Sequence, residues 1–211
     1  MFSIIVPTFN NLNYLELCLK SIKKNSAFNH EIIIHINEGI DGTLEYLQKK
    51  EYKFTYSALN SGVCVAFNEA AKLATNEYIV LAHDDMYFCP RWDEVFFNEL
   101  KNIHEDYDFF LSGTMIQPFE SYINLDCGKN LKEFDEKKLL KKLPDIKFND
   151  FQGTHWQPSL IPIKTWKKVG GFSEEFSPGL GSDPDFNFKL WNIGVRLFKG
   201  LSECRVYHFS S

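Results

Sequence analysis

The chain has 211 residues, of which 44% are apolar, and a formal net charge of −5. This length fits one domain with a substantial core. The negative charge argues against a general nucleic-acid binder, because phosphate binding requires a basic surface. No run approaches the roughly 20 apolar residues that cross a bilayer, and the N-terminus lacks the features of a signal peptide. The cysteines show no CxxC spacing, so we expect reduced thiols in a cytoplasmic protein; they are Cys18, Cys64, Cys89, Cys127 and Cys204.

Apolar runs and helical spacings alternate along roughly the first hundred residues. Four apolar runs predict strands, and helices are expected between them. Pro7 ends the first run, and the third run is weaker than the others. The strands are expected at 2–6, 31–36, 53–57 and 78–82, and the helices over 12–22, 44–47 and 63–74. A helix at 92–103 and a strand at 108–112 follow. This alternation predicts an α/β protein built from βαβ units around a mostly parallel sheet.

Polar segments follow three of the expected strands: PTFNN, NEGIDGT and HDDM. Because ligands of parallel sheets bind at the carboxyl ends of the strands, the chemistry should gather at this edge. Asp84 and Asp85 stand where the strand expected at 78–82 emerges from the core. Burying two adjacent carboxylates costs free energy unless a positive group lies nearby. No Lys or Arg follows until Arg91, so a bound cation is the first candidate.

Residues 114–160 show no strand-helix rhythm, as expected of a segment that shapes an acceptor site. Within it, residues 129–147 hold seven Lys against four Asp or Glu, and Leu139, Leu140 and Leu143 would give a helix an apolar face. A solvated surface helix is the favoured interpretation. The alternative is contact with anionic lipid headgroups or a lipid-linked acceptor, which would place the protein at the inner face of the membrane. A helix at 186–193 and a last strand within 203–211 close the chain.

Four segments, in this order and at these intervals, resemble the inverting nucleotide-sugar glycosyltransferases of family 2: SIIVPTFNN, EIIIHINEGIDGTLEYL, NSGVCVAFNEAAKLATNEYIVLAHDDM and GGFSEEFSPGLGSDPDFNFKLWNIG. The likeness covers nearly the whole chain. It implies one GT-A domain over residues 1–211, with a Rossmann-like sheet, a nucleotide-sugar half at 1–112 and an acceptor half at 113–211. The implied reaction moves a sugar from a UDP-, GDP- or dTDP-sugar to a hydroxyl of a glycan or lipid-linked acceptor. Surface polysaccharide synthesis is the family's commonest setting.

The leaving diphosphate carries negative charge, which Mn²⁺ or Mg²⁺ can offset. The resemblance implies that Asp85 is a direct metal ligand and that Asp84 contacts the ribose or the metal. His83 stands where the family has the first Asp of its D-x-D motif, and a neutral imidazole favours manganese. His208 is close to the family's distal histidine, a further metal ligand, although a histidine on a strand is often structural.

The resemblance also implies a donor pocket built from the loops after the first three strands. Structural roles stay open for several of its members: Pro7 could end a strand, and Asp41 and Asn60 could cap helices. The turn after the second strand offers an amide and a carboxylate to a base or ribose where the family has acidic residues. The expected donor-binding residues are Pro7, Thr8, Phe9, Asn37, Glu38, Asp41, Asn60, Gly62 and Asn68.

The SDPDF segment carries the implied catalytic base. The family's usual pair is Glu-Asp; Ser182 replaces the first member, and Asp183 remains to deprotonate the acceptor hydroxyl, so that the anomeric centre inverts. Acidic residues at a helix start also occur for dipole reasons alone. Asp185 and Trp156 are expected to bind the acceptor, Trp156 by stacking on a sugar ring, though a core position suits a tryptophan equally well.

Two alternatives come from other classes. The departures at His83, at the Asn37-Glu38 turn and at Ser182 leave open a GT-A domain that binds nucleotide or a partner without turnover. The IDGTL segment is superficially similar to the motif of haloacid-dehalogenase-like phosphohydrolases, but Gly39 stands at the nucleophile position, so that chemistry lacks its key residue.

Overall fold

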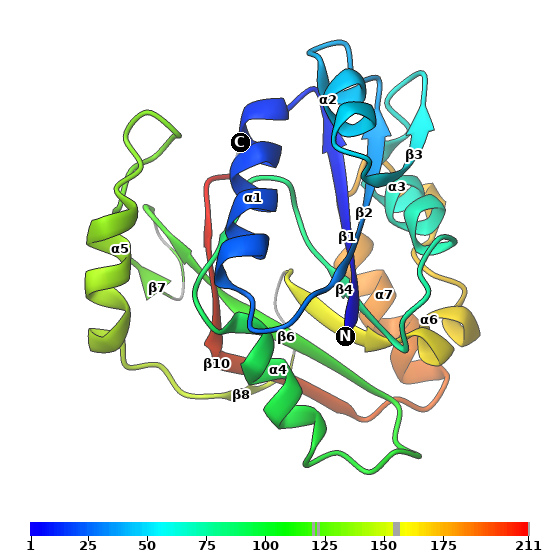
Figure 1. Ribbon diagram of the computed structural model, residues 1–211. Coiled ribbons are helices and arrows are strands. Elements are labelled where there is room, and N and C mark those ends of the chain that lie inside the picture. Colours follow the sequence, from blue (N-terminus) through cyan, green and yellow to red (C-terminus); the bar gives the residue numbers. More distant parts are fainter. Residues whose placement is uncertain (120, 122, 154–156, 211) are drawn as a thin grey trace.

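The computed structural model describes residues 1–119, 121, 123–153 and 157–210. Within them, ten strands form one sheet, in the order β3-β2-β1-β4-β9-β6-β10-β5, with β7 beside β6 and β8 beside β10 (Figure 1). The strands are β1 (Phe2–Phe9), β2 (Glu31–Asn37), β3 (Lys53–Ser57), β4 (Tyr78–Leu81), β5 (Met86–Phe88), β6 (Phe109–Gln117), β7 (Ile123–Asn124), β8 (Phe151–Gln152), β9 (Ser159–Pro162) and β10 (Leu197–His208). The helices are α1 (Leu12–Asn25), α2 (Thr43–Lys49), α3 (Gly62–Ala71), α4 (Trp92–Leu100), α5 (Glu136–Lys142), α6 (Ile163–Val169) and α7 (Ser182–Asn192), with short 3₁₀ turns η1 (Leu143–Asp145) and η2 (Glu174–Phe176).

The two faces of the sheet are covered by different helices, because side chains along a strand alternate between faces. On β1, Phe2, Ile4 and Val6 pack with apolar residues of α1, α2 and α4, whereas Ile5 packs with residues of α3, α6 and α7. Figure 1 shows the sheet between these two groups of helices. Burial on both faces explains why the central strands read as continuous apolar runs.

The predicted α/β class and mostly parallel sheet are confirmed, with antiparallel additions. β3, β2, β1 and β4 run parallel, as do β6 and β10. β9 lies antiparallel between β4 and β6, and β5 runs antiparallel to β10. The chain alternation that predicted the first four strands could not show this insertion, because β9 pairs with strands far away in the sequence.

Several boundaries differ from the sequence prediction. β1 continues through Pro7 to Phe9; its ladder with β4 ends at the Ile5–Leu81 pair, so Pro7 lies where only β2 is beside the strand, and a proline is tolerated there. β6 reaches Gln117, and β10 begins at Leu197 because it pairs with β6 along most of its length. α7 begins at Ser182, and β5 and α6 were not predicted.

The lysine-rich segment 129–147 lies at the margin of the molecule, where α5 packs beside α1 (Figure 1) and Lys24 forms a 2.6 Å ion pair with Glu136. Leu139 is fully buried in a third apolar cluster, and Leu143 packs against that cluster. The seven lysines are exposed. The apolar face of α5 is therefore used by the core, which agrees with the favoured surface-helix interpretation. Among the described residues, no helix is long and apolar enough to cross a membrane.

Candidate active site

Three adjoining cavities open at the carboxyl edge of the sheet, and His83 borders all of them. The first, of 190 Å³, is lined by most of the expected donor-binding residues: Pro7, Thr8, Phe9, Asn37, Asn60, Gly62 and Asp84. The second and third are 220 Å³ each and share Gln157 and Asp183. The third also contains His208. The fold thus brings the expected donor, metal and base residues to one edge.

Asp84 lines the first cavity, and the Thr8 hydroxyl donates a 2.6 Å hydrogen bond to its Oδ2. Burial, together with the neighbouring charge of Asp85, raises the pKa of Asp84 to about 7, although the Thr8 bond acts in the opposite direction. A carboxyl group in this position is stabilised in its charged form by any cation that binds nearby.

Asp85 is 5% exposed and pairs with His208, whose Nε2 lies 3.2 Å from Asp85 Oδ1. The antiparallel pairing of β5 with β10 sets His208 opposite Met86 and so brings it beside Asp85. The rings of His83 and His208 are 6.2 Å apart. Within the described part of the chain, no group of three or more His, Cys, Asp or Glu side chains is placed to hold a metal ion by itself.

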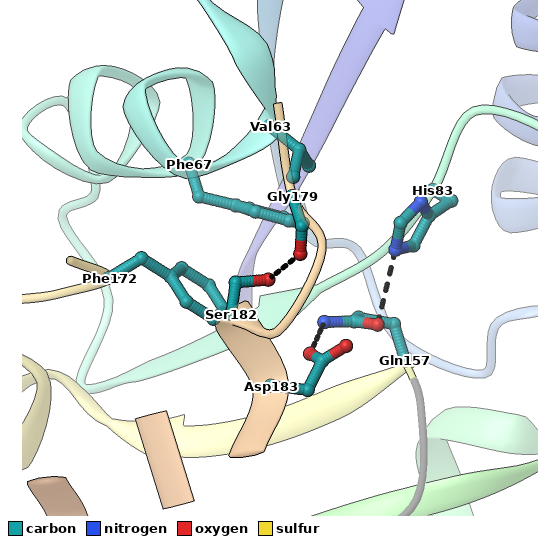
Figure 2. Close-up of a pocket in the computed structure, with 8 residues that line it drawn as sticks. All are labelled: Val63, Phe67, His83, Gln157, Phe172, Gly179, Ser182 and Asp183. Carbon is teal, nitrogen blue, oxygen red and sulfur yellow. Dashed lines mark hydrogen bonds between the residues drawn. The ribbon is translucent and has the colours of Figure 1, made fainter. Parts of the chain in front are cut away.

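His83, Gln157 and Asp183 form a hydrogen-bonded row across the second cavity (Figure 2). His83 Nε2 is 3.1 Å from Gln157 Oε1, and Gln157 Nε2 donates to Asp183 Oδ1 at 3.2 Å. Burial lowers the pKa of His83, although the charge of Asp85 acts against it. Gln157 was not among the expected site residues, because only the long-range pairing of β9 with β4 brings it here.

Hydrogen bonds connect the segments that follow β1, β2 and β3 beside the first cavity. Asn10 Nδ2 donates to Glu38 at 3.0 Å, and Asn37 accepts from the Ser61 backbone N–H and hydroxyl at 2.9 and 2.8 Å. Glu38 is not among the residues that line this cavity. Its left-handed backbone, with φ +61°, forms the turn instead.

Asp41 connects the starts of two helices. Its carboxylate accepts from the Leu12 backbone N–H at 2.7 Å, at the start of α1, and from the Thr43 hydroxyl at 2.7 Å, at the start of α2. Burial alone would raise the pKa of Asp41, but these hydrogen bonds outweigh burial and lower it. Asp41 therefore has the capping role that the sequence left open, and it lies outside the three cavities.

The start of α3 contacts the loop before α7. The Val63 backbone N–H donates to the Pro178 carbonyl at 3.1 Å. A Cβ at Gly62 would lie 2.9 Å from Pro178 Cα, so the close approach requires glycine. The Asn60 side chain accepts from the Gly62 backbone N–H at 3.0 Å, which is a capping contact.

Asn68 has a supporting position rather than a cavity position. Its amide donates to the Phe172 carbonyl and accepts from the Phe172 N–H, each at 2.9 Å. This clamp fixes Phe172, which lines the second cavity, and Asn68 itself lines none of the three. The sequence prediction of a donor contact for Asn68 therefore has no cavity contact to support it.

Ser182 and Asp185 complete the start of α7. The Ser182 hydroxyl donates to the Gly179 carbonyl at 2.7 Å and closes the turn where the family has a carboxylate (Figure 2). Asp185 Oδ2 is buried and has no hydrogen-bond partner among the described residues, and Asp185 does not line the three cavities. Trp156 lies outside the described residues.

A known protein family matches the part of the chain that contains this edge of the sheet. The model of glycosyl transferase family 2 matches residues 3–155, well over half of the chain. The chain belongs to glycosyl transferase family 2. The match includes the residues of the first cavity except Pro178, together with Asp85, whereas Asp183 and His208 lie beyond it.

Curated relatives include two synthases of Pasteurella multocida. A chondroitin synthase (strain Pm70) is 26% identical over 99% of this chain and 21% of its own length. A hyaluronan synthase is 26% identical over 99% of this chain and 20% of its own length. This family 2 chain thus spans about a fifth of the length of these relatives.

Solved structures show the same GT-A fold. TarS 1-349 from S. aureus matches 98% of this chain and 60% of its own chain, with a TM-score of 0.73 and 19% identity. The mannosyltransferase PcManGT from Pyrobaculum calidifontis, in complex with GDP-Man and Mn²⁺, matches 100% of this chain and 57% of its own, with a TM-score of 0.66 and 17% identity. TarS 1-349 in complex with UDP-GlcNAc also matches, with a TM-score of 0.69.

Proposed function

We propose that this family 2 chain transfers a sugar, with inversion and with the help of a divalent cation, from a nucleotide-sugar donor to a hydroxyl of a glycan or lipid-linked acceptor. The observation that carries the proposal is that three cavities share His83 as a lining residue. Asp84 lines the first cavity and Asp183 lines the other two, while Asp85 pairs with His208, which lines the third. A transferase needs both functions, charge neutralisation and proton removal, on opposite sides of the transferred sugar.

Asp85 and His208 are the residues that would hold Mn²⁺ or Mg²⁺, with His83 adjoining. Two protein ligands fit such an ion, because ions of this class are often bound by one or two side chains and by substrate phosphates. The buried Asp84 carboxyl, whose pKa is raised to about 7, supports the presence of a cation in the working site. When bound, the ion would offset the charge of the leaving diphosphate. The histidines favour Mn²⁺ over Mg²⁺.

The first cavity is the proposed nucleotide site. Thr8 holds Asp84 beside the pocket, and Phe9, which is 47% exposed, offers an open ring face to a base. The relatives support this assignment: TarS has been solved with UDP-GlcNAc and PcManGT with GDP-Man. A dTDP-sugar is the third candidate donor. Residues 1–112 form the proposed donor half.

Asp183 is the proposed general base. One oxygen, Oδ1, is held by Gln157, and the acceptor hydroxyl would give its proton to the carboxylate as it attacks the anomeric carbon. Attack from the side opposite the diphosphate inverts that carbon. Residues 113–211, with Asp185 and Trp156, form the proposed acceptor half.

The biological setting is also a proposal. The two synthases suggest polysaccharide synthesis. Five free, buried cysteines support a cytoplasmic location, and the exposed lysines of 129–147 would be the part of the chain that contacts the inner face of a membrane or a lipid-linked acceptor.

Two substitutions test the two halves of the proposal separately. Asp85→Ala should abolish cation-dependent binding of nucleotide, measured by calorimetry with UDP or GDP and Mn²⁺. Asp183→Asn should keep that binding while transfer or slow donor hydrolysis falls by about 10²–10⁴-fold. Asp106→Asn, at a side chain that is 87% exposed, is the matched control. Near-normal transfer by Asp183→Asn would show that Asp183 is not the general base. Tight nucleotide binding by the wild type without any turnover would indicate a domain that only binds nucleotide.

A further inference from the structure

Gln157 occupies a position that the sheet itself determines. β9 pairs antiparallel with β4, and the last pair of that ladder is Leu81 opposite Ser159. Two residues beyond this end of each strand, the side chains of His83 and Gln157 meet at 3.1 Å. The side chain is 5% exposed and lies between the histidine that follows β4 and the aspartate at the start of α7 (Figure 2).

The two hydrogen bonds of Gln157 have a fixed polarity. A carboxylate can only accept hydrogen bonds, so the amide NH₂ of Gln157 must face Asp183 and the amide oxygen must face His83. The amide oxygen can only accept, so the His83 nitrogen that meets it, Nε2, must carry a proton. The lone pair of a neutral His83 ring is then on Nδ1.

The same contacts leave one atom of each neighbour available. Among the residues that the structure describes, Asp183 Oδ2 and His83 Nδ1 receive no hydrogen bond, while Asp183 Oδ1 and His83 Nε2 are engaged by Gln157. His83 and Asp183 both border the second and third cavities. Gln157 therefore determines which atom of each side chain is already engaged by the protein.

We propose that Gln157 is a positioning residue for glycosyl transfer: its amide holds the Asp183 carboxylate and the His83 ring together in one orientation, with Asp183 Oδ2 left to accept the acceptor proton and His83 Nε2–H directed at Gln157. This inference rests on the proposed role of Asp183. Gln157 does not line the first cavity, so its effect should fall on the transfer step more than on nucleotide binding.

The kinetic test uses Gln157→Met, which keeps the side-chain length and removes both hydrogen bonds. We expect kcat to fall about 10–100-fold, the range found when residues that orient reactive groups are removed, with a smaller change in donor KM. Gln48→Met, on the exposed face of α2, is the control. On an Asp183→Asn background, Gln157→Met should cause little further loss, because the residue through which it acts is already gone. An equal, additive loss on both backgrounds would overturn the proposal.

A second measurement needs no turnover. A long-range ¹H–¹⁵N spectrum of the wild-type protein, assigned with a His83→Gln variant, should show His83 protonated at Nε2. Gln157→Met should lose this single tautomer, whereas Gln48→Met should keep it. A proton on Nδ1 in the wild type would overturn the proposal, even if the protein transfers sugar. If the wild type transfers none but shows the Nε2 proton, the arrangement of Gln157 stands and the proposed reaction fails.

Discussion

Replacing Asp84 by Asn should stabilise the metal-free protein, and the gain should depend on pH. Burial moves the pKa of Asp84 from an ordinary 3.8 to about 7 in the folded protein. Well below pH 4 the carboxyl is neutral in both states and does not change the free energy of unfolding. Between these values the unfolded state is ionised and the folded state is not, so the free energy of unfolding falls by about 1.4 kcal/mol per pH unit. Above pH 7 the free energy of unfolding has been lowered by about 4 kcal/mol in total, and this reduction no longer changes with pH.

Asn has the same shape and can still accept the Thr8 hydrogen bond, but it carries no charge. Urea unfolding of Asp84→Asn and wild type, in chelator at pH 4, 6 and 8, should therefore show the smallest difference at pH 4, an intermediate one at pH 6 and the largest at pH 8. For a chain of this size, about 4 kcal/mol corresponds to about 8–16 °C in Tm. Asp106→Asn should show no such trend. A stabilisation that is the same at all three pH values, or a loss of stability at pH 8, would refute the reasoning.

Three other substitutions probe the scaffold, each measured by urea or thermal unfolding. Asp93→Asn should cost about 3 kcal/mol, because fully buried Asp93 accepts hydrogen bonds from the His30 ring and from three backbone N–H groups. Burial alone would raise the pKa of Asp93, but these bonds outweigh burial and lower it, so the loss should be complete at pH 7 and shrink as the pH falls below about 4. Gly171→Ala should cost about 2 kcal/mol, because φ is +67° and the new Cβ would lie 2.3 Å from Asn68 Oδ1. Arg205→Met should cost about 2 kcal/mol, since the guanidinium is buried and donates to three backbone carbonyls.

The first half of the fold could be predicted from the sequence because its neighbours in space are neighbours in the chain. β1, β2, β3 and β4 are linked by helices, so each apolar run and each helical spacing directly predicts an element and its place. The positions of Thr8, Asn37 and Asp84 at one edge follow from the same rule, since parallel strands end together.

The second half could not be predicted in this way, because its elements depend on distant partners. β9 is four residues long and is held by β4 and β6 on either side. Nothing in its own sequence indicates that Gln157 will lie opposite His83. Similarly, Asp41 and Asn68 have polar side chains in the expected segments, but both make structural contacts. Asp41 bonds with the Leu12 backbone and Asn68 with the Phe172 backbone, and the spacing of residues along the chain does not reveal these partners.

The antiparallel insertion of β9 also explains how one chain can join two kinds of chemistry. Parallel strands alone would bring the carboxylates after β4 to the sheet edge but would leave the start of α7 without a direct link to them. Because β9 runs in the opposite direction, its first residues lie at the edge where β4 ends, and Gln157 reaches both His83 and Asp183 from there. A shift of β9 by two residues would break both hydrogen bonds at once. The register of this short strand therefore sets the spacing between the proposed cation site and the proposed base, and we expect substitutions that weaken the β4–β9 ladder to reduce transfer more than nucleotide binding.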